Sequence, residues 1–296
     1  MENKTTKNAN IGVLYVLLSA LFFAASSSFG KIITRNSELS GAMSSFSRFT
    51  VGTMIMFVYM VATKKSFKAN KMKHIVFRAV SNSISILLFS IGFQFTTITN
   101  VNMLQMTYPV FVMILAPLLY KEKIAKKSYF YLVLVMLGCY LVAYPKFDNL
   151  NIGDVLGFLS AIAGAFSVLS LKNARKYDDT YIIIFYVFLI AMAINFPFAL
   201  RDFPKLTADP FIIFNILMSG LAGFLGQIFI TEGYKYVDNA TGAMVSTSRI
   251  VIAAVMGYFI FNDPINLRIV IGGIIVIFAL IGASGYFGRK RAAKNK

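Results

Sequence analysis

Ten apolar stretches, each about as long as a helix that crosses a membrane, follow one another along the chain, with short polar segments between them. They span residues 11–33, 43–63, 75–95, 99–120, 128–145, 152–172, 180–200, 211–231, 239–261 and 267–287. Because a membrane-spanning helix needs about 20 mainly apolar residues, the pattern predicts an all-α membrane protein with ten transmembrane helices. The first stretch is too long for a signal-peptide core and lacks a clean cleavage site, so we expect it to be a retained helix.

The composition agrees with this pattern and excludes most soluble functions. The chain is 57% hydrophobic and 14% charged, whereas soluble domains carry roughly 25% charged residues. It has one cysteine, Cys139, and one histidine, His74, so neither an intrachain disulfide nor a Cys/His metal site can form. We expect no catalytic residue, metal or cofactor, and therefore no enzyme.

The formal net charge of +17 is unevenly distributed over the predicted loops. If the chain begins on the cytoplasmic side, 20 Lys and Arg residues lie on that side and 6 on the other, with three more inside spans. Because cytoplasmic loops carry an excess of Lys and Arg, both termini are predicted to be cytoplasmic. The basicity is then a topological signal, and it does not indicate a nucleic-acid partner.

The chain resembles itself at a constant shift of 141 residues. Gly12 matches Gly153, the Leu18–Ala20 segment matches residues 159–161, and Lys31 matches Lys172. Since each half would hold five spans, an odd number, the second half must enter the membrane from the opposite side. We therefore predict two inverted five-helix repeats, residues 11–145 and 152–287, between cytoplasmic tails at 1–10 and 288–296. Inverted repeats are common in secondary transporters, whose substrate site lies near the midplane.

The end of each half carries a further pattern. The first half reads NVNMLQMTYPVFVMILAPLLYKEKI and the second NATGAMVSTSRIVIAAVMGYFIFNDPI. This arrangement, a fourth helix that runs into an acidic turn before a fifth helix, resembles the EamA-like branch of the drug/metabolite transporter superfamily. The resemblance implies a ten-helix inner-membrane carrier of small metabolites. Pro109 stands at the family's mid-helix proline, but its counterpart is Ile250, so we expect the second half to lack the helix distortion that proline produces.

Arg249, near the middle of the ninth span, is the first candidate for contact with a substrate. Charged groups inside a membrane are costly and are usually functional. The 141-residue shift pairs Arg249 with Tyr108, which lies near the middle of the fourth span. We expect Arg249 to bind a carboxylate or another anionic group of the substrate, and Tyr108 to supply its hydroxyl or ring. The alternative is that Arg249 is structural, tied to helix carbonyls or to Glu232.

Polar residues surround these two positions at helical spacing. Asn102, Gln105 and Tyr108 recur every three residues, and Ser246 lies on the same helix face as Arg249. They would line the cavity or, alternatively, form hydrogen bonds between helices.

Four further charged residues lie near the ends of spans. Arg48 lies about five residues inside the second span and is a candidate for an outer vestibule, whereas Arg78 is expected to anchor the third span at the cytoplasmic surface. Glu122 and Asp263 end the fourth and ninth spans and are candidates for helix-end contacts or gating.

All 12 carboxylates fall in loops, tails or helix ends, which leaves proton coupling without a midplane acid and favours exchange or facilitated diffusion. We therefore predict a secondary transporter for a small polar metabolite, amino-acid-like or otherwise carboxylate-bearing, acting as a monomer or homodimer in contact with lipid. An alternative is uptake of a larger nucleoside-like cofactor of the S-adenosylmethionine or riboflavin type. A membrane-embedded lipid-modifying enzyme lacks the necessary His/Asp/Glu cluster, and an ion channel would need a filter motif or charge rings.

Overall fold

The computed structural model describes residues 2–92, 95–96, 98–145, 151–206 and 208–284, and over these residues it is all-helical. Side chains of residues 2–8, 98 and 99 are not described. The predicted tail at 288–296 lies outside the described residues. The elements are α1 Glu2–Asn36, α2 Gly41–Ala62, α3 Met72–Gly92, α4 Ile98–Gln105, α5 Tyr108–Tyr120, α6 Lys126–Ala143, α7 Ile152–Ala174, α8 Thr180–Ala199, the 3-10 helix η1 Leu200–Lys205, α9 Pro210–Gly233, α10 Asn239–Ser246, α11 Arg249–Phe261 and α12 Leu267–Ala283.

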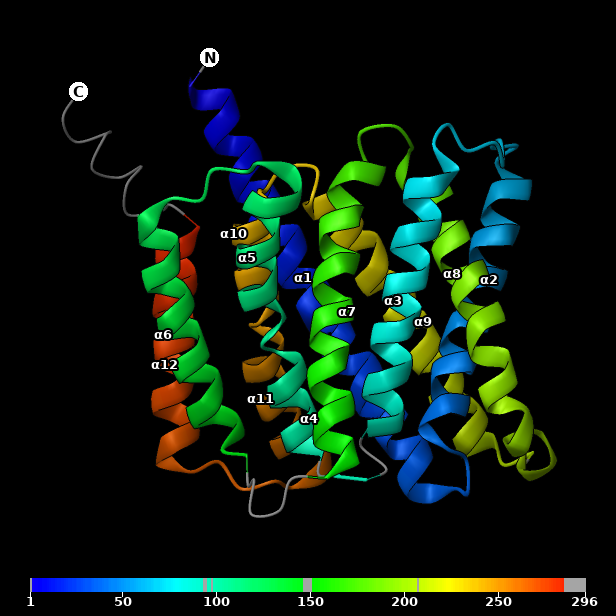
Figure 1. Cartoon of the computed structure of the whole chain (residues 1–296). Coiled ribbons are helices and arrows are strands. Elements are labelled where there is room, and N and C mark those ends of the chain that lie inside the picture. Colours follow the sequence, from blue (N-terminus) through cyan, green and yellow to red (C-terminus); the bar gives the residue numbers. More distant parts are fainter. Residues whose placement is uncertain (1, 93–94, 97, 146–150, 207, 285–296) are drawn as a thin grey trace.

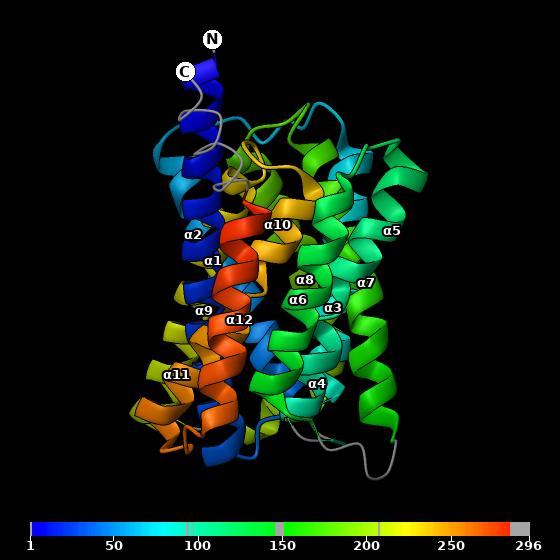
Figure 2. The ribbon, with the colours of Figure 1, turned by 90° about the vertical axis from the view of Figure 1, so that its left-hand side faces the viewer.

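The helices form one bundle with loops at two ends (Figures 1 and 2). The upper end of Figure 1 holds the start of α1, the end of α12 and the loops 63–71, 121–125, 175–179 and 234–238. The lower end holds the loops 37–40 and 262–266 and the η1 region. Nine continuous or broken helical spans in the described residues are long and apolar enough to cross a membrane, and α12 is a shorter apolar helix. The chain is a multi-pass membrane protein.

Small residues bring neighbouring helices together. The long contacts are α1 with α9, α3 with α7, α6 with α12, and α2 with α8. Where α6 meets α12, a Cβ on Gly138 would lie 2.8 Å from the Gly272 carbonyl oxygen, and a Cβ on Gly272 would lie 2.8 Å from the Gly138 oxygen. Lipid gives no hydrophobic drive for helix association, so such close backbone packing is a main source of its stability.

Two of the predicted spans are broken in the middle. The fourth is divided into α4 and α5 at residues 106–107, and the ninth into α10 and α11 at residues 247–248. The expectation that the second half lacks a distortion was therefore wrong. Thr247 Oγ1 donates to the Met244 carbonyl (2.6 Å), as Thr107 Oγ1 does to that of Leu104 (2.6 Å), and backbone bonds three residues apart tighten both turns. A hydroxyl thus breaks the second span where no proline is present.

Candidate functional site

One cavity of about 560 Å³ lies in the core of the bundle. Lys31, Ser44, Asp263 and Pro264 line its lower part, and residues of the described upper-end loops do not. The cavity therefore reaches the lower end of the bundle, and it extends upward past the middle, where Arg78 and Ile230 line it. All six residues predicted to bind substrate lie in its wall: Arg48, Asn102, Gln105, Tyr108, Ser246 and Arg249.

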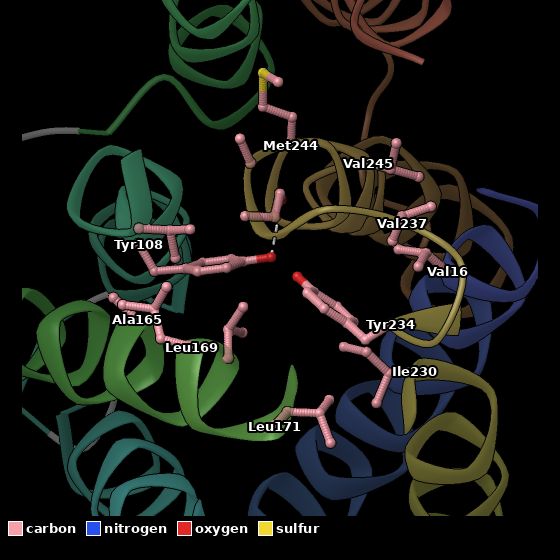
Figure 3. Packing of buried hydrophobic residues seen from close by; sticks show 14 of the residues in the cluster. Val16, Tyr108, Ala165, Leu169, Leu171, Ile230, Tyr234, Val237, Met244 and Val245 are labelled. Atoms are coloured by element: carbon pink, nitrogen blue, oxygen red, sulfur yellow. Dashed lines mark hydrogen bonds between the residues drawn. The ribbon is translucent and has the colours of Figure 1, made fainter. Parts of the chain in front are cut away.

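The two breaks place Tyr108 and Arg249 at the cavity, because these residues begin α5 and α11. Each side chain reaches the opposite half of the chain. The Tyr108 hydroxyl donates to the carbonyl oxygen of Ala243 on α10 (2.9 Å; Figure 3), and Arg249 Nη2 donates to Gln105 Oε1 on α4 (2.6 Å). Tyr234, at the end of α9, directs its hydroxyl toward Tyr108 in Figure 3. The two equivalent positions therefore connect the four half-helices across the centre of the bundle.

The remaining predicted residues differ in how firmly they are held. Ser246 Oγ donates to the Gly242 carbonyl one turn earlier (2.9 Å), which keeps its oxygen close to the helix. Asn102 is half-buried on α4. Because the break follows Gln105, the predicted polar stripe continues onto a separate helix at Tyr108 instead of running along one helix.

Arg48 lies eight residues into α2, counted from the lower end. Its guanidinium stands over the Phe23 ring, 5.2 Å from the centroid. The side chain also packs on Gly223 of α9, where a Cβ would come within 2.9 Å of Arg48 Cδ. Arg48 lies in the cavity wall, and the glycine makes room for its side chain. Its role in an outer vestibule stays a prediction.

The sequence predicts that Arg78 anchors the third span at the cytoplasmic surface, and the structure shows that this prediction is wrong. Arg78 is only 2% exposed, it lines the cavity, and its Nη1 donates to Ser167 Oγ on α7. The sequence shows how far Arg78 is from the end of its span, but it does not show which face of the helix the residue occupies. The prediction failed for this reason. α3 packs along α7 at this height, and the residue lies on the packed face.

Polar contacts join helices at the upper end of the bundle. Glu122 Oε1 accepts from Lys172 Nζ at 2.5 Å, and Glu122 Oε2 accepts from Asn239 Nδ2 at 3.1 Å. Beside them, Thr180 donates to Glu232. Among the described residues, α10 also packs against α5 here, whereas α4 and α11 make no comparably extensive contact at the lower end. Glu122, one of the two predicted gating residues, therefore joins α5 to α7 and α10.

The lower end carries a weaker ion pair. Lys31 Nζ lies 3.8 Å from Asp263 Oδ2, with side chains 29% and 57% exposed, and the same ammonium lies 4.1 Å from the centroid of the Phe261 ring. The 141-residue shift pairs Lys31 with Lys172 and Glu122 with Asp263. The two ends therefore hold equivalent ion pairs, one short and one long.

Three lining residues had weak or no signal in the sequence analysis: Arg78, Ser219 and Gln227. Comparison of the halves could have indicated two of them, since the 141-residue shift pairs Arg78 with Ser219 and both are polar residues within spans. Gln227 stands alone as an amide within an apolar span, which is itself a signal for an intramembrane polar site.

Comparison with known proteins decides the family. The profile of the EamA-like transporter family matches residues 10–144 and again residues 151–285. The chain belongs to the EamA-like transporter family. Its membership confirms the resemblance to drug/metabolite transporters, and the protein is a membrane transporter.

Relatives of this EamA-like transporter span nearly its whole length at low identity. The pseudopaline exporter CntI of Pseudomonas aeruginosa is 22% identical over 92% of this chain and 95% of the exporter. The S-adenosylmethionine uptake transporter of Rickettsia bellii is 21% identical over 99% of both chains, and mouse solute carrier family 35 member G1 is 24% identical over 93% of this chain and 78% of the carrier. One solved crystal structure, 13% identical, superposes with a TM-score of 0.75 over 97% of this chain and 98% of that one, which shows the fold alone.

Proposed function

We propose that this EamA-like protein is a secondary transporter that carries a small polar metabolite with a carboxylate or another anionic group across the inner membrane by alternating access. The observation that carries the proposal is the cavity, which reaches one end of the bundle and is closed from the other by an ion pair. No chemical conversion of the substrate is part of the proposal.

Alternation requires two states of similar energy, and an inverted pair of repeats would provide them. In support, α1 begins at the upper end and α7 at the lower end (Figure 1), and the shift of 141 residues turns the α1–α9 contact into the α3–α7 contact. The two units proposed are residues 11–145 and 152–287. In each unit, an acidic gate residue, Glu122 or Asp263, follows the fourth span and precedes the last helix.

We assign the ion pairs to the two gates. In the state seen here, Lys172 and Glu122 close the upper gate at 2.5 Å, while Lys31 and Asp263 stand 3.8 Å apart beside the open cavity. If the Lys31–Asp263 pair became short and the Lys172–Glu122 pair became long, the cavity would close at the lower end and open at the upper end. The broken spans supply hinges at the level of Tyr108 and Arg249, since short 3-10 turns within helices often mark such points.

The upper end is assigned to the cytoplasm. The Lys and Arg residues near the helix ends whose side chains are described are, at the upper end, Lys64, Lys65, Lys68, Lys71, Lys73, Lys121, Lys123, Lys126, Lys127, Lys172, Arg175, Lys176 and Lys235, and at the lower end, Lys31, Arg35, Arg201, Lys205 and Arg268. Thirteen against five follows the positive-inside tendency. Both termini would then be cytoplasmic, and the cavity would open outward.

A second candidate substrate is a nucleoside-like cofactor such as S-adenosylmethionine. It is favoured by the full-length similarity to a Rickettsia protein named as an S-adenosylmethionine uptake transporter. The cationic character of the cavity, with Arg48, Arg78 and Arg249 in its wall, favours an anionic substrate instead. The experiment below decides between them by comparing entry of labelled S-adenosylmethionine with entry of the carboxylate-bearing compounds.

The proposal is tested by reconstituting the purified protein in liposomes and measuring entry of labelled glutamate, serine, succinate and S-adenosylmethionine. We expect saturable entry of at least one carboxylate-bearing compound, and a loss of about 90% or more in Arg249→Ala, because a charge-assisted contact of about 1.5–3 kcal/mol is removed. The control is Arg201→Gln, which removes an exposed cation outside the cavity. Entry of every compound at the same rate in folded Arg249→Ala and in the parent would refute the role given to Arg249.

A further inference from the structure

The charge of the cavity wall is strongly unbalanced. Four cationic residues line it, Lys31, Arg48, Arg78 and Arg249, against one carboxylate, Asp263. Asp263 stands at the lower mouth and pairs with Lys31. Apart from Asp263 at the mouth, the described residues that line the cavity include no carboxylate to pair with the three guanidiniums farther inside.

Among the described residues, these three guanidiniums contact only neutral groups. Arg249 donates to the Gln105 amide oxygen, Arg78 to the Ser167 hydroxyl, and Arg48 stands over an aromatic ring. The Nε atoms of Arg48 and Arg78 are buried without a hydrogen-bond partner among the described residues. Because buried charges are normally paired or fully hydrogen-bonded, this arrangement is costly for the empty protein and points to an anionic ligand.

Comparison of the two halves separates these arginines from the residues that the fold requires. The 141-residue shift pairs Arg48 with Leu189, Arg78 with Ser219, and Arg249 with Tyr108, so each arginine has an uncharged counterpart. The counterpart of the Arg78–Ser167 contact is a serine pair, in which Ser26 Oγ donates to the Ser219 carbonyl (2.7 Å). The same helix packing thus forms without an arginine.

The three arginines also lie at different depths. Arg48 is about 10 Å along α2 from its lower end, Arg78 is about 9 Å along α3 from its upper end, and Arg249 lies between them where α11 begins. One carboxylate has two oxygens and can hold one or two guanidiniums, whereas the described residues of the cavity wall carry three without a counter-ion. Three such guanidiniums call for more than one anionic group.

We propose that the transported substrate carries at least two separated anionic groups, carboxylates or phosphates, which Arg48, Arg78 and Arg249 bind at successive depths of the cavity. This inference rests on the proposed transport function and narrows its substrate class. Arg78, closest to the closed end, receives the group that enters deepest. Arg48 receives the group nearest the opening.

The test is isothermal titration calorimetry of the purified protein with five probes of graded charge: citrate, succinate, propionate, neutral succinamide and inorganic phosphate. We expect affinity to fall from citrate to succinate to propionate, by about tenfold or more per anionic group lost, with no detectable heat for succinamide. Comparison of succinate with phosphate distinguishes carboxylate from phosphate recognition. Equal affinity for succinate and succinamide, or no binding by any anionic probe, would overturn the proposal.

Variants copied from the other half of the chain test the individual arginines. Arg48→Leu and Arg78→Ser each place the counterpart's residue type at the site, and each is expected to weaken citrate binding about 10- to 100-fold while changing propionate binding less than about threefold. Arg201→Gln, an equal change of net charge outside the cavity, is the matched control. A lower melting temperature of the ligand-free variant with an unchanged ratio of citrate to propionate affinity would show a structural role and overturn the assignment.

Liposome flux separates this inference from the transport function on which it rests. Saturable flux with no preference for dianions over monovalent or neutral solutes would refute the charge inference and leave transport standing. Tight citrate binding without flux of any bound probe would instead refute transport and leave the charge inference standing.

Discussion

The upper ion pair gives the sharpest mechanical prediction. Glu122→Gln keeps the shape of the side chain and a carbonyl oxygen for Asn239, but it removes the charge that holds Lys172. If this contact closes the upper gate, its loss favours the state that is open at the upper end.

The magnitude follows from the geometry. A charge-assisted hydrogen bond of 2.5 Å contributes about 1.5–3 kcal/mol when buried. The Lys172 and Glu122 side chains are 31% and 21% exposed, so water weakens the contact, and we take about 1–2 kcal/mol for the pair. That free energy corresponds to a shift of about 5- to 30-fold in the equilibrium between the two states.

The assay uses a reporter cysteine that is covered while the upper gate is closed. Ala240 lies in α10, is 3% exposed and sits beside the gate, and the native Cys139 is fully buried and gives little background. In Ala240→Cys, reaction with a water-soluble thiol reagent reports the fraction of molecules open at the upper end. We expect Glu122→Gln to raise the rate about 5- to 30-fold.

The equivalent residue at the other end is the control. The Lys31–Asp263 pair is long and exposed, so Asp263→Asn should change the Ala240→Cys rate less than about twofold. A rate within about twofold of the parent in Glu122→Gln, or equal acceleration by both substitutions, would refute the gating role of Glu122.

Three further results are expected. Gly138→Ala should lower the free energy of unfolding by about 1–3 kcal/mol, because the new Cβ meets the Gly272 oxygen. Gly273→Ala should not, because its nearest neighbour would lie 3.5 Å from the new Cβ. Thermal unfolding measures both variants, and equal melting temperatures would contradict the role of close packing at Gly138. Pro109→Ala should keep at least half of the parent flux, since the other half of the chain breaks its helix without proline; loss of flux in a folded variant would show that proline is needed. Tyr108→Phe should lower the free energy of unfolding by about 1 kcal/mol through its lost bond to α10, and an unchanged denaturation curve would contradict this.

Much of the fold can be predicted from the apolar runs, because a helix that crosses lipid needs about 20 mainly apolar residues wherever it packs in the bundle. The sequence indicated Arg249 by its place near the middle of a span and Tyr108 by the 141-residue shift, and both line the cavity. The position of Arg78 could not be obtained this way, because burial depends on which helix packs on that face. The break at residues 247–248 was also missed, because a threonine hydroxyl that bonds to a carbonyl three residues earlier leaves no signal as clear as proline.

The unpaired arginines have a consequence for how the cycle turns over. Closing the cavity around no cargo would remove three guanidiniums from water without an anion to replace it, at a cost of several kcal/mol for each ion that stays uncompensated. In the proposed mechanism, a bound anion would lower this barrier, so the loaded protein would change sides faster than the vacant one. Return with a second cargo would then be faster than return with none, and we expect antiport between two pools of anions instead of net leakage from either.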